Sequence, residues 1–168
     1  KPAYALYKTE LDQRPVVIQH FFGITGSDEQ LRELVPLQQK SMQPLSGHPN
    51  TQHLYAASLF PVYLVWDYND GGTLQDRLYQ LVPMHEGSAV RITCEPRGQQ
   101  YNMAEKVSWV RQIITALYFV HKHNGTHRDL KSGNIMFRTL PASRQSSERS
   151  SGASSEEVKL VGFCTKNI

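Results

Sequence analysis

The chain has 168 residues, of which 39% are hydrophobic and 10% aromatic, and this is enough apolar side chain for one folded domain. A formal net charge of only +3 gives no indication of a nucleic-acid partner or of a charged membrane surface. No apolar run is long enough to span a bilayer, and the two cysteines, Cys94 and Cys164, are too far apart for a paired metal site. We therefore expect a reduced, cytoplasmic protein without a membrane span.

The first third of the chain predicts strands around one helix. Residues 6–8 and 15–21 are β-rich runs that predict two strands joined by a polar turn. The next segment, 27–40, predicts a helix that starts at a Ser or Asp cap and is kinked by a proline. Two more strands are predicted at 54–60 and 62–68.

A short helix is predicted at 73–80, followed by an irregular surface insertion at 81–100. The insertion is predicted from its helix and strand breakers, which are Pro83, Gly87, Pro96 and Gly98. The long helix predicted at 104–122 has two apolar stripes and should be buried on most sides. The stripes are Val107, Val110, Ile114, Leu117 and His121, and Trp109, Ile113, Ala116 and Val120.

The last part of the chain predicts two short strands around a polar insertion. Residues 135–137 and 158–161 are the apolar runs that predict the strands. Between them, 143–157 is predicted to be a disordered insertion, because it has seven serines from Ser143 to Ser155 and too little apolar surface to offset the entropy of ordering.

One short segment carries the chemistry. It reads His127-Arg128-Asp129-Leu130-Lys131-Ser132-Gly133-Asn134 and matches the catalytic loop of protein kinases at fixed offsets. In that loop the Asp accepts or orients the proton of the attacking hydroxyl, and the Asn five residues later holds a metal ion. Asp129, Lys131 and Asn134 are therefore the candidate catalytic residues, with Asn134 also a candidate metal ligand and His127 and Arg128 in support.

Around this loop the chain resembles the protein kinase superfamily. Lys131 is typical of serine/threonine kinases, and the sequence as a whole is similar to the tyrosine-kinase-like group. The resemblance implies an α+β bilobal fold, with a small antiparallel-sheet lobe and one regulatory helix above the beginning of a helical large lobe. The expected boundaries are 1–66 for the small lobe, 67–72 for the hinge and 73–168 for the start of the large lobe.

The resemblance also implies a nucleotide site. Trp66 takes the gatekeeper position. The other residues of the nucleotide site are expected to be Val17, Gln19, Asp67, Tyr68, Asn69 and Met136. Tyr4 falls at the third glycine of the family's Gly-rich loop, so the chain is expected to begin inside that loop. It is likewise expected to end at the start of the activation segment, as a truncated domain.

Three anchors of the family pattern are changed. Gln19 stands where a Lys holds the phosphates, and Gln38 or Gln39 stands where a Glu pairs with that Lys. Two amides that could bond to each other, Gln19 and Gln38, are thus expected in place of the ion pair. Gly162, in Gly162-Phe163-Cys164, replaces the Asp that binds magnesium. ATP and Mg²⁺ are the family's ligands, and these changes argue against both.

Three functions stay open at this point. The first is a pseudokinase that acts as a signalling scaffold or allosteric regulator through protein partners, with weak or no phosphoryl transfer. The second is an active, atypical serine/threonine kinase in which Lys8 or Lys159 substitutes for the lost Lys. The third is a truncated fragment without a function of its own. A nucleotide is a candidate small-molecule partner, although the changed anchors argue against ATP, and no nucleic acid is expected.

Overall fold

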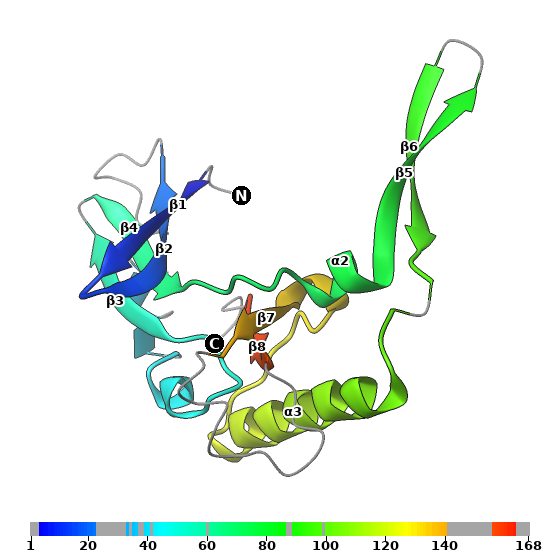
Figure 1. The fold of residues 1–168 in the computed structure, drawn as a ribbon. Coiled ribbons are helices and arrows are strands. Elements are labelled where there is room, and N and C mark those ends of the chain that lie inside the picture. The colour runs from blue at the N-terminus through cyan, green and yellow to red at the C-terminus, as the bar shows by residue number, and fades with distance from the viewer. Residues whose placement is uncertain are drawn as a thin grey trace.

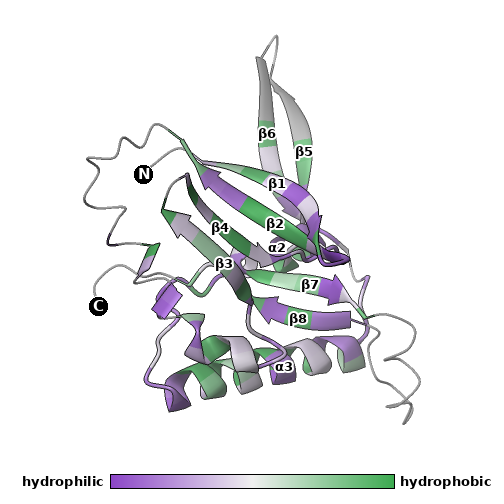
Figure 2. Ribbon diagram, turned by 90° about the vertical axis from the view of Figure 1, so that its left-hand side faces the viewer, coloured by the Kyte–Doolittle hydropathy of each residue, from purple (hydrophilic) through white to green (hydrophobic). Residues whose placement is uncertain are grey.

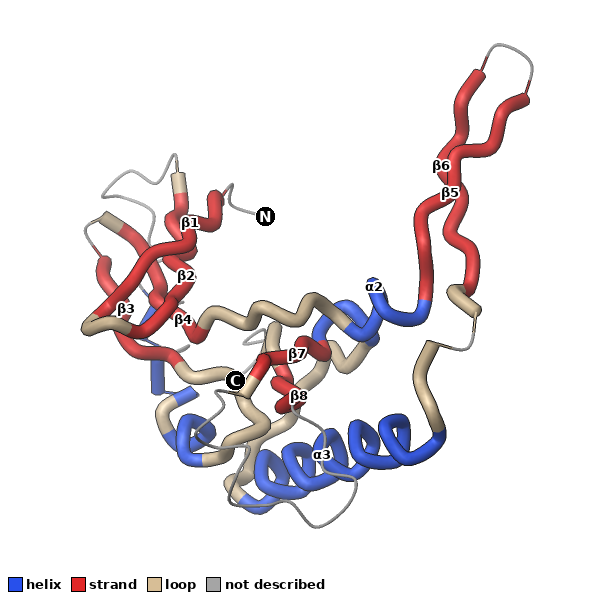
Figure 3. Tube along the Cα trace, viewed as in Figure 1, coloured by secondary structure: helices blue, strands red, loops and turns tan. Residues whose placement is uncertain are grey.

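The computed structural model describes residues 4–22, 33, 35–36, 39–40, 42–59, 61–86, 89–98, 100–140 and 156–163. In chain order its elements are β1 (Tyr4–Leu11), β2 (Arg14–Phe21), a 3₁₀ turn (Pro44–Gly47), β3 (Leu54–Leu59), β4 (Val62–Asp67), α2 (Leu74–Leu78), β5 (Tyr79–Glu86), β6 (Ala89–Pro96), α3 (Met103–Lys122), a second 3₁₀ turn (Ser132–Asn134), β7 (Ile135–Thr139) and β8 (Glu156–Leu160). An antiparallel sheet stands above a lower part built on α3, with a hairpin projecting away from both (Figures 1 and 3). This confirms the predicted α+β fold class.

The upper sheet has the strand order β1-β2-β4-β3, and all its pairs are antiparallel. Asp12 and Gln13 join the first two strands with φ angles of 48° and 64°, as a two-residue hairpin turn requires. In the register of β2 with β4, Val17 lies opposite Trp66 and Gln19 lies opposite Leu64. The four strands predicted from this part of the sequence are confirmed, and the register places Gln19 next to the gatekeeper strand.

The predicted helix at 27–40 lies mostly outside the described residues. Those of its residues that are described, including Val35 and Gln39, are helical. Val35 and Met42 are both buried in the cluster that packs under the upper sheet. Gln38, the expected partner of Gln19, is outside the described part of the chain.

The helix predicted at 104–122 is confirmed as α3, which lies beneath the β7–β8 pair (Figure 2). It begins at a capping box, in which Asn102 accepts a hydrogen bond from the Glu105 amide and the Glu105 carboxylate accepts one from the Asn102 amide. The side chains of Trp109, Ala116 and Val120 face the core and are buried.

The expectation that α3 is buried on most sides is wrong for the described structure. Of the other stripe, Val107, Val110 and Ile114 are 50%, 54% and 60% exposed, and His121 is exposed as well. The two short strands β7 and β8 cover one face of the helix. The opposite face therefore keeps an apolar row without a partner among the described residues.

The segment predicted to be irregular, 81–100, is instead mostly the β5–β6 hairpin, which is paired from Tyr79 opposite Pro96 to Glu86 opposite Ala89. It projects from the end of α2 (Figure 1). The prolines misled the prediction because a two-stranded hairpin has only edge strands. Pro83 is tolerated in an edge strand because its missing N–H need not pair with a neighbour.

The short helix predicted at 73–80 is present as α2, and a bidentate ion pair ties it to β8. Arg77 donates from Nη1 and Nη2 to the two carboxylate oxygens of Glu156, each at 2.7 Å. The same guanidinium lies 3.5 Å from the centre of the Phe137 ring on β7. This contact fixes the segment that follows the upper sheet against the lower strands.

The two predicted strands at the end of the chain are confirmed as β7 and β8, which pair antiparallel. The predicted disordered insertion, 143–157, lies outside the described residues except for Glu156 and Glu157. These two belong to β8, so the prediction extended two residues too far.

Phe163 packs against both hydrophobic clusters of the molecule. One cluster lies under the upper sheet and includes Met42 and Trp66, and the other lies between α3 and the β7–β8 pair. The segment after β8 therefore joins the upper and lower parts through one aromatic ring.

Candidate active site

The catalytic loop folds around Asp129. The Asn134 amide donates to the backbone oxygen of Asp129 at 2.7 Å and to its Oδ2 at 2.8 Å. The Lys131 ammonium also reaches Oδ2 at 2.8 Å. Hydrogen bonds from Lys131 and then from Asn134 hold the pKa of Asp129 below its ordinary value. Asp129 is therefore a half-exposed, ionised carboxylate held by Lys131 and Asn134.

His127 links the catalytic loop to the segment that follows β8. It is buried, and its Nε2 donates to the backbone oxygen of Val161 at 3.0 Å. Its ring lies 4.4 Å from the Phe163 ring, centre to centre. Burial lowers the pKa of His127, so the neutral imidazole joins the catalytic loop to the segment after β8. Arg128 beside it has a φ of 63°, which turns the chain between His127 and Asp129.

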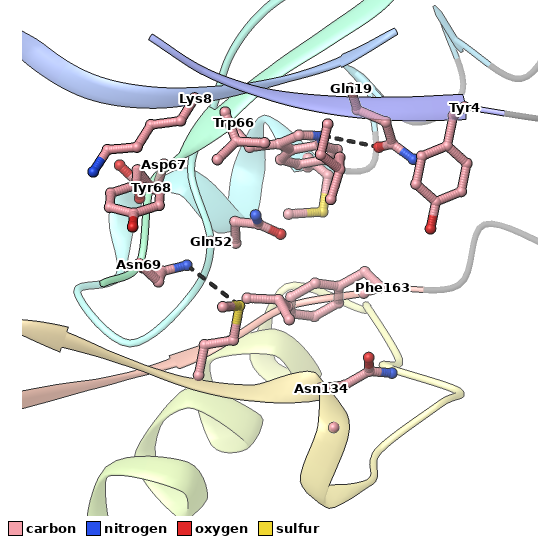
Figure 4. Close-up of a pocket in the computed structure, with 17 residues that line it drawn as sticks. Tyr4, Lys8, Gln19, Gln52, Trp66, Asp67, Tyr68, Asn69, Asn134 and Phe163 are labelled. Atoms are coloured by element: carbon pink, nitrogen blue, oxygen red, sulfur yellow. Dashed lines mark hydrogen bonds between the residues drawn. The ribbon is translucent and has the colours of Figure 1, made fainter. Parts of the chain in front are cut away.

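A cavity of about 650 Å³ lies between the upper sheet and the lower strands (Figure 4). All six residues expected to contact a nucleotide line it, namely Val17, Gln19, Asp67, Tyr68, Asn69 and Met136, and so do Asn134 and Gly162. The structure therefore brings the predicted nucleotide residues together with two members of the catalytic loop, Gly133 and Asn134. Asp129, Lys131, His127 and Arg128 are not among the lining residues.

On the upper wall of the cavity, the amide of Gln19 stands where protein kinases have a phosphate-binding Lys. Gln19 Oε1 accepts a hydrogen bond from Trp66 Nε1 at 3.2 Å (Figure 4). The expected pairing of Gln19 with Gln38 involves a residue outside the described part of the chain, and the described partner is Trp66. Gln19 therefore adds no positive charge to the site where phosphates would lie.

Gly162 lies against the amide of Asn134. Its φ is 72°, and a Cβ built at this position would lie 2.8 Å from Asn134 Cγ and Oδ1. Asn134 is itself held in place by its two hydrogen bonds to Asp129. The space that a side chain at 162 would need is thus filled by the catalytic-loop amide.

These residues fit Mg²⁺ poorly. Magnesium in such sites is held by carboxylate and phosphate oxygens, but Gly162 has no carboxylate and Asn134 offers a single amide oxygen. In the described part of the chain no three His, Cys, Asp or Glu side chains are grouped so as to hold a metal ion. The donor set therefore does not match a magnesium–triphosphate complex.

Both lysines considered as substitutes for the lost Lys are engaged in other contacts. Lys8 lies over the Tyr68 ring, with its Nζ 4.1 Å from the ring centre. Lys159 is buried rather than solvated. Its Nζ bonds to the Pro49 carbonyl and lies 3.2 Å from Glu157.

The cavity lining also includes residues that were not predicted as ligand contacts, among them Gln52 and Met42. Gln52 follows the His48-Pro49-Asn50 turn and projects into the middle of the cavity (Figure 4). Met42 lines the same cavity from the end of the regulatory helix segment. The available signal was the position of Gln52 two residues after that turn, in the polar stretch that precedes β3.

Comparison with known proteins agrees with this geometry. The family model described as protein tyrosine and serine/threonine kinase matches residues 4–163. The chain belongs to the protein kinase family. The match includes the upper sheet, the catalytic loop and the glycine at position 162.

Curated relatives include several named protein kinases. A calcium/calmodulin-dependent protein kinase, cmkB, from Emericella nidulans is 31% identical over 69% of this chain and 24% of its own length. CDPK-related kinase 5 from Arabidopsis thaliana is 31% identical over 58% of this chain and 14% of its own length. Human mitogen-activated protein kinase kinase kinase 7 is 30% identical over 67% and 16%, respectively. The match thus spans no more than about a quarter of these relatives.

The kinase family uses ATP and Mg²⁺. Among the helices that the structure describes, none combines the length and apolar character needed to cross a membrane.

Proposed function

We propose that this kinase-family chain is a pseudokinase, acting as a signalling scaffold or allosteric regulator with weak or no phosphoryl transfer. The observation that carries the proposal is the pair of neutral replacements in the cavity, Gln19 bonded to Trp66 and Gly162 packed on Asn134. Phosphoryl transfer depends on cations that balance charge on the phosphates. Losing one such contact typically costs about 3 kcal/mol of transition-state stabilisation, and here two are lost.

The structural position of the catalytic loop supports the same proposal. The Asp129 side chain is held by Lys131 and Asn134, and His127 is packed against Phe163. These contacts hold the loop folded whether or not phosphate is transferred. An intact catalytic loop is therefore compatible with a domain that works by binding proteins, and a cytoplasmic location belongs to this proposal.

The second candidate is an active, atypical serine/threonine kinase. The intact arrangement of Asp129, Lys131 and Asn134 favours it. Against it, Lys8 lies on Tyr68 and Lys159 is buried in contacts behind the cavity, so neither supplies the missing phosphate charge in this arrangement.

Thermal-shift titration with ATP, with and without Mg²⁺, together with transfer of labelled phosphate to a generic protein substrate, separates the two candidates. For a pseudokinase we expect no added stabilisation from magnesium. Phosphate incorporation should equal that of the Asp129→Asn variant. Magnesium-dependent stabilisation together with transfer that Asp129→Asn abolishes would overturn the proposal.

A gain-of-function variant tests the two replacements themselves. The Gln19→Lys, Gly162→Asp double variant returns the phosphate cation and the metal carboxylate, and we expect it to gain magnesium-dependent ATP binding if the rest of the cavity is sound. Its free energy of unfolding must be measured alongside, because position 162 has a positive φ.

We also propose that the chain is part of a larger bilobal domain, with 1–66 as small lobe, 67–72 as hinge and 73–168 as the start of the large lobe. The exposed apolar row on α3, which includes Val107, Val110 and Ile114, supports this, because further large-lobe helices would cover it. If the 168 residues are instead a fragment without function, the full-length transcript will encode no helical segment after Ile168.

A further inference from the structure

We infer that two copies of this chain pair through their projecting hairpins, with β6 of one copy antiparallel to β6 of the other and a two-fold axis at Thr93. The two hairpins then form one four-stranded sheet. The inference goes beyond the proposed function and does not depend on what the cavity binds.

The β5–β6 hairpin has two open edges. It stands apart from the rest of the molecule (Figure 1). Among the described strands, β5 and β6 pair only with each other, so each has an outer edge without a neighbouring strand. A two-stranded hairpin alone is marginally stable in water, whereas sheets of three or more strands are more stable. A further strand at one of these edges would therefore stabilise the hairpin.

The outer edge of β6 is better suited to accept a strand than the outer edge of β5. The Arg97 amide donates to the Leu78 carbonyl at 2.7 Å, and these residues lie opposite each other when the hairpin register is extended by one pair. Hydrogen-bonded and non-hydrogen-bonded pairs alternate along an antiparallel ladder, so the backbone N–H and C=O groups of Ile92 and Cys94 point away from β5. The outward positions of β5 include Pro83, which has no N–H to donate.

The sequence of β6 is complementary to an antiparallel copy of itself. With Thr93 of one copy opposite Thr93 of the other, Arg91 lies opposite Glu95 on both sides of the axis. These are the two charged residues of β6, and opposite charges directly across a ladder attract. In the same register Ile92 lies opposite Cys94, so the outward backbone groups of these two residues exchange hydrogen bonds.

The apolar side chains fit the same occupant. Ile92 and Cys94 are exposed in the single chain and lie on the same face as the exposed Leu81, which is opposite Cys94 in the hairpin. Pairing places Ile92 of each copy beside Cys94 of the other and removes apolar surface from water. A two-fold interface uses the same patch on both copies. Because β6 meets this requirement in both its charges and its apolar positions, the occupant is a second copy.

Sedimentation equilibrium of the whole chain tests the inference through a charge exchange. We expect the unaltered chain to form a dimer that dissociates on dilution. Arg91→Glu and Glu95→Arg, each alone, put like charges opposite each other and should weaken self-association about tenfold. An equimolar mixture of the two variants should regain the dimer, because every charged pair across the axis again joins opposite signs. Arg111→Glu makes the same charge change at an exposed position on α3 and should leave the dimer unchanged.

A cysteine at the two-fold axis tests the register. The two Thr93 residues form a non-hydrogen-bonded pair with Cα atoms about 4.5 Å apart, which is close enough for a disulfide. Thr93→Cys in a Cys94→Ser, Cys164→Ser background should therefore form a linked dimer with copper phenanthroline as oxidant. Gln80→Cys in the same background is the control, because this exposed position lies on β5, away from the axis.

Three results would contradict the inference. The first is a chain that stays monomeric at its highest soluble concentration. The second is a mixture of the charge variants that is no more dimeric than its components. The third is a Thr93→Cys variant that links no faster than Gln80→Cys. A dimer that both single charge variants retain in full would place the interface elsewhere, such as on the exposed apolar row of α3, and the inference would again be wrong. The mixture remains informative even if one variant is less stable, since the gain on mixing requires both.

Discussion

At the scale of single residues, this kinase-family chain has a glycine at position 162, where the family pattern has an aspartate. The side chain of Asn134 packs directly against this glycine. Gly162 has a φ of 72°, a region that residues with a Cβ adopt with strain. Asn134 fills the space next to it and is held by Asp129. The absence of a side chain at position 162 and the packing of the catalytic loop are therefore parts of one local arrangement.

Gly162→Ala should lower the free energy of unfolding by roughly 1–3 kcal/mol, because the methyl group meets both the positive φ and the Asn134 amide. Urea denaturation followed by tryptophan fluorescence measures the change.

The matched control is Gly98→Ala, where a Cβ would meet no atom within 4 Å. This variant should be within about 0.5 kcal/mol of the unaltered chain. Equal stability of the two variants would show that Asn134 and the backbone at 162 adjust freely.

At the scale of elements, the β5–β6 hairpin is attached to the molecule mainly at its base. Arg97 donates its backbone N–H to the Leu78 carbonyl and its Nε to the Tyr79 carbonyl. Beyond this base the exposed apolar residues Leu81 and Ile92 are 74% and 70% exposed. The hairpin thus contributes little to the two hydrophobic clusters.

Replacement of residues 81–94 by Asn-Gly should leave the rest of the chain folded, with a change in free energy of unfolding below about 1 kcal/mol. The Gln80–Glu95 pair stays in place, and Asn-Gly supplies the two-residue turn that closes it. Thermal unfolding monitored by circular dichroism tests this.

Arg77→Met serves as the comparison, since it breaks the bidentate contact with Glu156 and should cost about 2–3 kcal/mol. If the shortened hairpin costs as much as Arg77→Met, the hairpin is part of the core.

At the scale of the whole molecule, the buried His127 and the partly buried His48 make stability depend on pH. Burial lowers the pKa of His127 from its ordinary value of 6.5. Burial, followed by the charge of Lys159, lowers the pKa of His48 as well. The folded chain keeps these rings neutral, whereas the unfolded chain binds protons below pH 6.5, so acid favours unfolding.

The free energy of unfolding should therefore be constant from pH 8 to about 7 and should fall as the pH drops below about 6.5 towards the folded-state pKa values. His127→Gln, which keeps an N–H donor for the Val161 carbonyl, should flatten the fall between pH 6.5 and 5.5. Urea titrations at each pH measure it, and an unchanged slope would remove His127 as the cause.

Features that depend on local sequence patterns could be predicted, whereas features that depend on contacts between distant residues could not. The four strands of the upper sheet, α3 and the catalytic loop were predictable, since alternation, helical periodicity and a fixed motif are local. The hairpin was missed because Pro83 was taken as a strand breaker, although an edge strand tolerates it. The exposed face of α3 was missed because periodicity shows an apolar face but not what covers it.

The candidate site divides in the same way. The motif and the resemblance identified Gln19, Asn69 and Met136, and the structure brings them to one cavity. The Gln19–Trp66 hydrogen bond and the unpartnered Oδ1 of Asn69 were not predictable, because both depend on side-chain directions across separate strands.

The packing of Gly162 against Asn134 also bears on the evolution of this chain. Once glycine occupied position 162, the amide of Asn134 could settle into the space that a side chain would need. A single reverse mutation to Asp would then have to displace a residue that now helps to hold Asp129. A carboxylate at position 162 would therefore return only through coordinated changes at positions 162 and 134.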